Sequence, residues 1–205
     1  MLIGEKVKEN IEKIFAKKLK YPVTIAFKGK GDSISNKTEQ VLRELVSLNP
    51  KLEFEHNLDL DCIEPPCFSI YPTAEEDLGI RYMGEINGGE IQTIIDTIVM
   101  VSTKNHKISP RIEELVKQVD KDIEIKVFTT SSCGFCAPAI KIAYSFALVN
   151  SFIKTVVIDS YTFPHIAMKY NVVTVPKIVI NNKVEFFGAK EDNEFFGYIL
   201  QALEA

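Results

Sequence analysis

The chain has 205 residues, of which 46% are hydrophobic, and this allows either one large domain or two small ones. Its formal charge of −4 is mild and spread along the sequence, so nothing resembles the basic surface that nucleic acid requires. No apolar run approaches the roughly 20 residues that cross a bilayer, and charges interrupt every apolar stretch near the N-terminus. We therefore expect a cytoplasmic protein with neither a membrane nor a nucleic-acid partner.

The first half of the chain alternates helical and extended patterns. An amphipathic packing helix is predicted near the N-terminus, because one helical face collects Val7, Ile11, Ile14, Phe15 and Leu19. The patterns that follow predict a strand at 23–27, a helix at 36–48, strands at 51–58, 66–70 and 79–84, and a helix at 88–101.

The second half repeats this order. Ser109 and Pro110 open a short helix as N-cap and first helical residue. The later patterns predict a strand at 123–128, a helix at 136–149, a strand at 154–159, a helix at 162–170, strands at 176–180 and 183–188, and a helix at 191–203. The helix at 162–170 has no counterpart in the first half.

The repeat predicts an α/β protein made of two tandem thioredoxin-like domains, each a mixed β-sheet flanked by helices. A βαβ unit followed by a hairpin and a helix gives this architecture, and a CxxC motif at a strand-to-helix junction is typical of it. The polar loop 102–109 separates the halves, so we expect a first domain at 1–104 and a second at 105–205.

The CxxC motif lies at the first strand-to-helix junction of the second half, at Cys133 and Cys136. Backbone N–H groups and the helix dipole favour a thiolate at such a position. We therefore expect Cys133 to be the exposed attacking thiolate and Cys136 to resolve the mixed disulfide. Ser131 and Ser132 suit the capping of the helix. A pair of small buried residues is the alternative interpretation.

Pro176 begins an apolar strand, where proline removes a hydrogen-bond donor from the ladder. A cis Val175–Pro176 bond would explain this position and would free the Val175 backbone to pair with a substrate peptide. We expect Thr174, Val175 and Pro176, together with Phe135 of the CxxC motif, to bind the substrate.

The first half lacks an equivalent motif. Asp32 to Ser35 align with Cys133 to Cys136, and these side chains cap helices but cannot carry electrons. Cys62 and Cys67 flank Pro65-Pro66, and Pro66 is the counterpart of Pro176. We expect two unrelated thiols here; a second redox pair, bonded to each other or exchanging with Cys133, is the alternative.

Other candidate residues carry little signal. A zinc site of the four cysteines is disfavoured, because four residues including two prolines separate Cys62 from Cys67. The three histidines, His56, His106 and His165, are scattered, which favours surface or capping roles. We expect neither a metal nor a cofactor.

The second half resembles the C-terminal unit of the glutaredoxin-like protein disulfide oxidoreductases of thermophilic archaea and bacteria. The resemblance is carried by "KVFTTSSCGFCAPAIKIAYSFA" and "MKYNVVTVPKIVI", and the first half is similar to the same family's N-terminal unit in "GIRYMGEINGGE". It implies a protein dithiol–disulfide oxidoreductase acting through Cys133 and Cys136, with protein thiols as substrates and a thioredoxin-reductase-like flavoprotein as a partner. The family often carries CxxC in both units, so the N-terminal unit is degenerate here. The buried acid of many thioredoxins is also missing, because Val127 stands six residues before Cys133.

The chain is also similar to the N-terminal module of bacterial alkyl hydroperoxide reductase flavoproteins, a tandem pair with a silent first half. This resemblance implies electron donation to a peroxiredoxin as an alternative function. The motif CGFC further resembles the CGFS of monothiol glutaredoxins, which bridge iron–sulfur clusters, but Ser131 and Ser132 replace the basic residue usual before it. An iron–sulfur or partner-binding module is therefore a weaker alternative.

Overall fold

The computed structural model describes residues 2–204. Its first half contains all the predicted elements, in the order α1 (Glu5–Lys18), β1 (Val23–Lys28), α2 (Ser33–Val46), β2 (Leu52–His56), β3 (Cys67–Pro72), β4 (Ile80–Met83) and α3 (Glu90–Thr103). Its second half adds one helix, as predicted: α4 (Pro110–Val116), β5 (Ile123–Thr129), α5 (Cys136–Val149), β6 (Ile153–Asp159), α6 (Pro164–Lys169), β7 (Lys177–Ile180), β8 (Val184–Phe187) and α7 (Asp192–Glu204).

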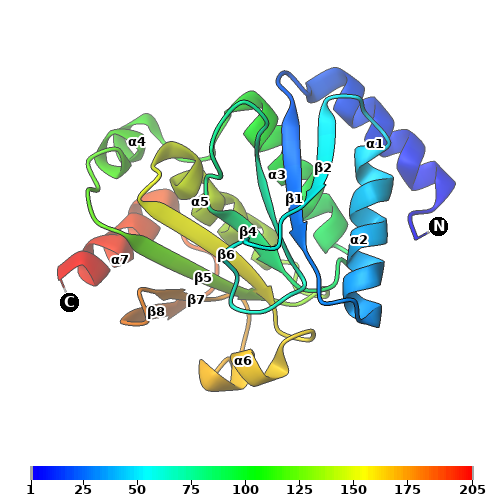
Figure 1. The fold of residues 1–205 in the computed structure, drawn as a ribbon. Helices are drawn as coiled ribbons and strands as arrows, with labels where there is room; N and C mark the ends of the chain where they lie inside the picture. The colour runs from blue at the N-terminus through cyan, green and yellow to red at the C-terminus, as the bar shows by residue number, and fades with distance from the viewer. Residues whose placement is uncertain (1, 205) are drawn as a thin grey trace.

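The two halves share one mixed sheet of eight strands, in the order β2-β1-β3-β4-β6-β5-β7-β8 (Figure 1). Each half contributes four neighbouring strands, and the parallel pair β4–β6 joins them, with Ile80 opposite Thr155 and Met83 opposite Ile158. An isolated half would leave β4 or β6 as an unpaired edge, which invites pairing with another chain. Pairing β4 with β6 leaves neither strand as an edge. The repeat in the sequence does not predict this pairing.

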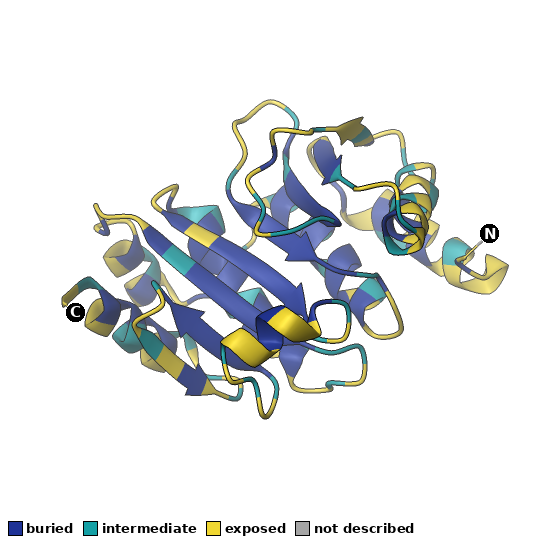
Figure 2. Ribbon diagram, turned by 60° about the horizontal axis from the view of Figure 1, so that its bottom comes forward, coloured by how far each residue is buried: buried dark blue, intermediate teal, exposed yellow. Residues whose placement is uncertain are grey.

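Side chains alternate between the two faces of the sheet, as the period of two in a strand requires. On β6, Ile153 and Val157 belong to the larger apolar cluster, whereas Val156 and Ile158 belong to a smaller one. Helices α3 and α5 cover the larger cluster, and α6 lies over the smaller one with its outer surface exposed (Figures 1 and 2). The strands between these layers are mostly buried.

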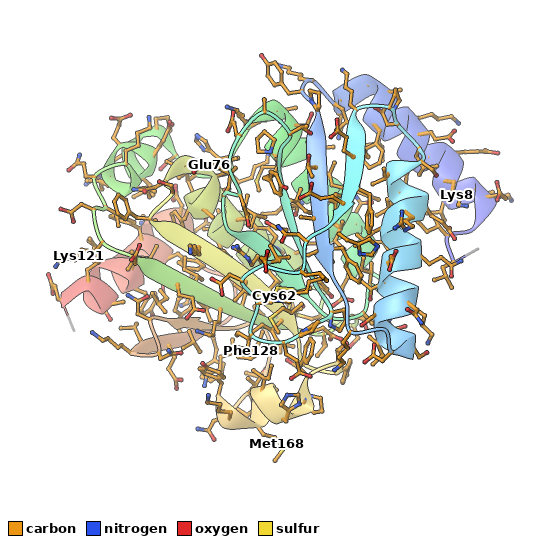
Figure 3. All side chains as sticks on the ribbon, viewed as in Figure 1. Lys8, Cys62, Glu76, Lys121, Phe128 and Met168 are labelled. Atoms are coloured by element: carbon orange, nitrogen blue, oxygen red, sulfur yellow. A yellow bond between two sulfur atoms is a disulfide. The ribbon has the colours of Figure 1, made fainter. Side chains whose placement is uncertain are left out.

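Residues 57–66 connect β2 to β3. At the equivalent place in the second half, between β6 and β7, the chain forms α6. We call residues 57–66 the β2–β3 loop. It crosses the sheet on the face of the smaller cluster, where Leu60 is buried, and Cys62 lies near the middle of the molecule (Figure 3). The loop therefore takes the place of the missing helix as the cover of this face.

Hydrogen bonds between the halves support the shared sheet. The Tyr144 hydroxyl on α5 donates to the carbonyl of Arg81 on β4 at 2.7 Å. The Glu85 amide donates to the hydroxyl of Thr162 at 3.0 Å. The boundary at residues 104 and 105 falls between α3 and α4, and the division into two domains stays a prediction.

Helix α2 begins at Ser33, three residues before the predicted range of 36–48. The Asp32 carboxylate is the N-cap and accepts a hydrogen bond from the Ser35 amide at 2.7 Å. These residues occupy the position that the CxxC motif has in the second half, so at this junction they cap the helix instead of carrying a redox pair. Within residues 2–204, no helix combines the length and apolarity that a bilayer crossing demands.

Candidate active site

The CxxC motif forms a disulfide at the end of β5. The Cα atoms of Cys133 and Cys136 lie 5.5 Å apart, and α5 begins at Cys136. The Cys133 amide donates to the Thr130 carbonyl at 3.0 Å, which turns the chain from the strand into the helix. Because Cys133 lies just before the first turn of α5, its sulfur is placed where a helix N-terminus favours the thiolate.

The two cysteines differ in accessibility, although Cys133 is less exposed than expected. Cys133 is half-buried and packs at the rim of the larger cluster, whereas Cys136 is 2% exposed. Only the first cysteine can be reached by a large disulfide substrate. This difference in burial fits the expectation that Cys133 attacks and Cys136 resolves, and that assignment stays a prediction.

The start of α5 differs from the prediction in one respect. Phe135 is the N-cap residue and no side chain caps the helix. Ser132 instead lies 3.5 Å from the hydroxyl of Thr130, and Ser131 packs against the first half. The two serines therefore do not cap the helix, because the CxxC turn inserts three residues between Ser132 and the first helical turn.

The Val175–Pro176 bond is cis, as predicted, and Pro65–Pro66 is a second cis bond. Thr174 is exposed, Val175 is half-buried beside the same cluster as Cys133, and Pro176 is buried. In the described part of the chain, no hydrogen bond engages the backbone groups of Thr174 or Val175. Together with Phe135, which is 76% exposed, this segment offers unpaired backbone and apolar surface to a peptide.

A buried carboxylic acid lies in the site, and it comes from the first half. Glu90, the first residue of α3, lines a cavity of about 220 Å³ together with Cys133 and Cys136. It is 5% exposed, and its Oε2 accepts a hydrogen bond from the Asn87 amide at 3.1 Å. Sequence reasoning misses this residue because it looks for the acid on β5, where Val127 stands.

The surroundings of Glu90 raise the pKa of its carboxyl group. Burial raises the pKa of Glu90 to about 7, from an ordinary value of 4.5. The Tyr82 hydroxyl and the Asn87 amide act in the opposite direction, and the negative charge of Asp159 adds to the increase. A carboxyl that titrates near neutral pH beside a buried thiol can accept and return a proton during disulfide exchange.

The turn that carries Glu90 fits closely against the CxxC segment. Gly88 has a φ of +51°, and a Cβ atom at this position would lie 3.4 Å from the Ser131 carbonyl oxygen. Gly89 follows, and its Cβ would lie 3.8 Å from the same oxygen. Side chains at both positions would make only ordinary contact with Ser131, so it is the positive φ of Gly88 that favours glycine in this turn.

The expectation of two unrelated thiols in the first half is wrong. Cys62 and Cys67 form a disulfide with Cα atoms 6.5 Å apart, so no free cysteine remains in residues 2–204. Cys67 faces the smaller cluster, whereas Cys136 faces the larger one. The pairs therefore lie on opposite faces of the sheet, and a short path for exchange between Cys62–Cys67 and Cys133 is absent from this structure.

His56 and His165 are exposed, as predicted, whereas His106 is half-buried. Each lies within ion-pair distance of a glutamate: His56 with Glu39, His106 with Glu113 and His165 with Glu64. None of them lines the cavity of the CxxC motif.

Comparison with known proteins agrees with this geometry. Residues 123–201 match the family model of the Thioredoxin domain. The fold of the whole chain is similar to that of the alkylhydroperoxide reductase AhpF from Enterococcus faecalis, with a TM-score of 0.86, 21% identity and coverage of 96% of this chain and 99% of that one. It is also similar to a protein disulfide oxidoreductase from Aeropyrum pernix, with a TM-score of 0.84, 22% identity and coverage of 96% and 91%. The chain has the tandem thioredoxin fold of these structures.

The chain is also similar in sequence to an alkyl hydroperoxide reductase protein. The corresponding alkyl hydroperoxide reductase protein of Escherichia coli is 23% identical over 171 residues, which are 83% of this chain and 32% of the relative. The chain thus spans about a third of the length of that relative.

Proposed function

We propose that the chain is a protein dithiol–disulfide oxidoreductase that uses the Cys133–Cys136 pair. The observation that carries the proposal is the disulfide at the start of α5, with one sulfur half-exposed and the other buried beside an acid. This arrangement fits exchange with a substrate, because attack and resolution need sulfurs of different accessibility.

In the reducing direction, the Cys133 thiolate attacks one sulfur of a substrate disulfide. The substrate's S–S bond breaks, a mixed disulfide forms on Cys133, and one substrate thiolate leaves. Cys136 then gives up its proton and attacks the Cys133 sulfur, which releases the second substrate thiolate and closes the Cys133–Cys136 disulfide. Two electrons pass from the dithiol to the substrate, and the reverse sequence oxidises a substrate dithiol.

Glu90 is the group in the cavity that can take the proton of Cys136. A buried carboxylate holds a proton more strongly than one in water, so the basicity of Glu90 approaches that of the thiol. In the reverse direction the protonated carboxyl returns the proton to the departing Cys136 sulfur. The first half of the chain thereby supplies the acid–base group of the second half.

Substrate polypeptides bind in an extended conformation along the segment 173–176. The free backbone groups of Thr174 and Val175 suit the addition of a peptide strand, and Val173, 85% exposed, and Phe135 supply apolar contact.

Insulin reduction in the presence of dithiothreitol tests the proposal. The wild-type protein is expected to accelerate precipitation of the insulin B chain, and Cys133→Ser is expected to abolish this. The double variant Cys62→Ser/Cys67→Ser is the matched control, because it removes the same chemical groups from the other face. Wild-type turnover by Cys133→Ser would refute the assignment.

Electron donation to a peroxiredoxin is the second candidate, and the likeness to the alkyl hydroperoxide reductase proteins favours it. In this version a thioredoxin-reductase-like flavoprotein reduces Cys133–Cys136 in the cytoplasm, and a peroxiredoxin oxidises it. Peroxide consumption in a mixture of the three proteins would support this candidate, provided that Cys136→Ser stops it.

The proposed dithiol–disulfide oxidoreductase is, more specifically, a glutaredoxin-like protein disulfide oxidoreductase with a degenerate N-terminal unit. This part of the proposal rests on the CGFC motif and on the likeness to the Aeropyrum protein.

A further inference from the structure

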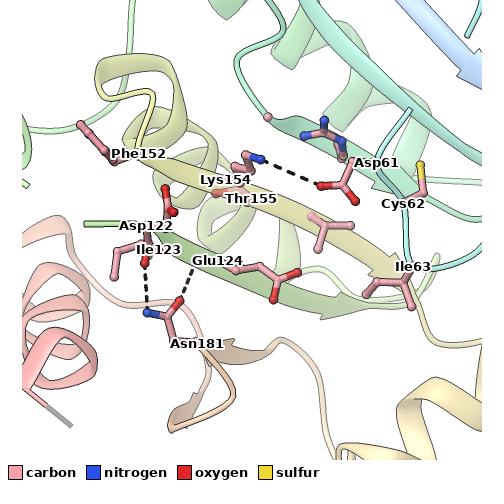
Figure 4. Close-up of a pocket in the computed structure, with 13 residues that line it drawn as sticks. Asp61, Cys62, Ile63, Asp122, Ile123, Glu124, Phe152, Lys154, Thr155 and Asn181 are labelled. Carbon is pink, nitrogen blue, oxygen red and sulfur yellow. Dashed lines mark hydrogen bonds and ion pairs between the residues drawn. The ribbon is translucent and has the colours of Figure 1, made fainter. Parts of the chain in front are cut away.

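A second cavity, of about 290 Å³, lies where the two halves meet, on the face opposite the CxxC motif. The β2–β3 loop supplies Asp61, Cys62 and Ile63, and β6 supplies Lys154 and Val156 (Figure 4). This volume lies just below the range of about 300–1,000 Å³ for ligand pockets. It suits a small molecule better than a folded protein surface.

The cavity carries charges of both signs. Arg81 is nine-tenths buried; one of its Nη atoms lies 2.7 Å from Asp77, but its Nε has no hydrogen-bond partner in the described chain. Lys154 lies 3.9 Å from Asp61, a long contact that leaves both groups able to bind a ligand. Asp122 and Glu124 add two further carboxylates, of which Glu124 pairs with Lys126. Such a lining fits a zwitterion, whose carboxylate would bind the cations and whose ammonium would bind the acids.

One cysteine of the second disulfide also lines the cavity. Cys62 is half-buried and lines the cavity, whereas Cys67 is fully buried among apolar side chains. We propose that Cys62–Cys67 is a second thiol–disulfide exchange centre, which reacts with a small zwitterionic thiol of amino-acid or short-peptide size, or with its disulfide, bound in this cavity.

The exchange begins at Cys62. The thiolate of the bound molecule attacks the Cys62 sulfur, the Cys62–Cys67 bond breaks, and Cys67 leaves and takes up a proton. A second molecule of the thiol attacks the mixed disulfide, releases Cys62 as a thiol and forms the small disulfide. Two small thiols are oxidised and one protein disulfide is reduced, and the reverse sequence oxidises the protein pair.

A cation lies on the side of the leaving sulfur. Lys28 is directly opposite Cys67 in the β1–β3 register, so the two side chains share a face of the sheet. Its Nζ donates to the Leu60 carbonyl at 3.0 Å, which holds the charge over the β2–β3 loop. This charge favours Cys67 as a departing thiolate.

The β2–β3 loop is held by contacts that do not depend on the disulfide. Glu64 accepts hydrogen bonds from Lys30 at 3.0 Å and pairs with His165 at 2.8 Å, and the Asn57 amide donates to the Phe27 carbonyl at 2.9 Å. The two cysteines therefore stay close after reduction, which lets the pair reform. A bridge that closes so short a loop also constrains the unfolded chain less than one that closes a long loop.

The test uses the full chain with Cys133→Ser/Cys136→Ser, so that only Cys62 and Cys67 can react. The reduced protein is mixed with cystine, with oxidised glutathione or with the uncharged hydroxyethyl disulfide. Alkylation of the remaining thiols and mass spectrometry give the rate of reoxidation. We expect at least one zwitterionic disulfide to react about 10-fold faster than the uncharged one, with a rate that saturates with concentration.

Lys154→Gln should lower that preference at least 3-fold, whereas Lys13→Gln, which removes an exposed charge on α1 remote from the cavity, should not change it. Equal, unsaturable rates with all three disulfides, or resistance of the two thiols to oxidation, would overturn the proposal. Because the CxxC motif is absent from this variant, failure here is separate from failure of insulin reduction by the wild-type protein.

Discussion

Glu90 and Cys136 come from different halves of the chain and line the same cavity. The first half has no CxxC motif, yet it supplies the one carboxyl among the described residues that lines the cavity of the second half's redox pair. The continuous sheet fixes this arrangement, because the β4–β6 pairing sets α3 beside α5. The two halves therefore form this cavity together.

The rate of disulfide exchange should depend on Glu90. Glu90→Gln keeps the size of the side chain but cannot accept a proton, so we expect turnover with insulin to fall by about 10²-fold. Wild-type turnover should rise through about pH 7 as Glu90 ionises, and the variant should lose this step. A pH–rate profile measures both. An unchanged profile would show that Glu90 only fills space.

The same substitution should change how stability depends on pH. The carboxyl titrates near 4.5 in the unfolded chain and at about 7 in the folded one. Between these values the folded state holds the extra proton, so stability falls as pH rises, by roughly 3 kcal/mol in total. We expect Glu90→Gln to be more stable than wild type at pH 8 and to lose this slope. Urea unfolding of the oxidised proteins at pH 4 to 8 measures the effect, with Glu12→Gln, an exposed glutamate on α1, as the control.

A side chain at Gly88 should destabilise the protein because of the backbone conformation there. Gly88→Ala places a Cβ on a residue with a φ of +51°, 3.4 Å from the Ser131 carbonyl oxygen. We expect a loss of about 1–2 kcal/mol in unfolding free energy, with slower disulfide exchange as the turn moves. Gly197→Ala on α7 is the matched control, because nothing lies within 4 Å of its Cβ, and it should gain about 0.5–1 kcal/mol. Equal effects of the two changes would contradict the packing described here.

The hydrogen bond from Tyr144 to the Arg81 carbonyl should contribute to the joint between the halves. Tyr144→Phe removes a buried bond of 2.7 Å, and we expect a loss of about 1–2 kcal/mol. Tyr161→Phe removes an exposed hydroxyl from a side chain that is 68% accessible and should be neutral. Denaturant unfolding of both variants measures the free energy of unfolding, and equal values for the two variants would contradict a stabilising role of the Tyr144 hydrogen bond.

Local patterns predict much of the fold. The period of the apolar residues indicates every strand, and Asp32 indicates the start of α2, because both depend on neighbours in the sequence. The positions of Cys133, Cys136 and Pro176 predict the core of the site for the same reason. The helix missing from the first half is also visible in the sequence, and its replacement by the β2–β3 loop explains why the sheet stays covered there.

The remaining features depend on contacts between distant residues. Glu90 follows two glycines in a turn, and only the β4–β6 pairing brings it to Cys136. The sequence disfavours the Cys62–Cys67 disulfide, because a buried cysteine in a strand is most often only an apolar residue. Ser132 lies before the CxxC turn, and the length of that turn decides that Phe135 becomes the N-cap.

The most direct measurement uses the Cys136→Ser variant in a single turnover with a disulfide-bonded protein. Without its resolving sulfur, the protein should accumulate a mixed disulfide on Cys133, close to one substrate per chain, and peptide mapping by mass spectrometry should locate it there. Absence of this adduct, or an adduct on Cys62 or Cys67 alone, would contradict the account.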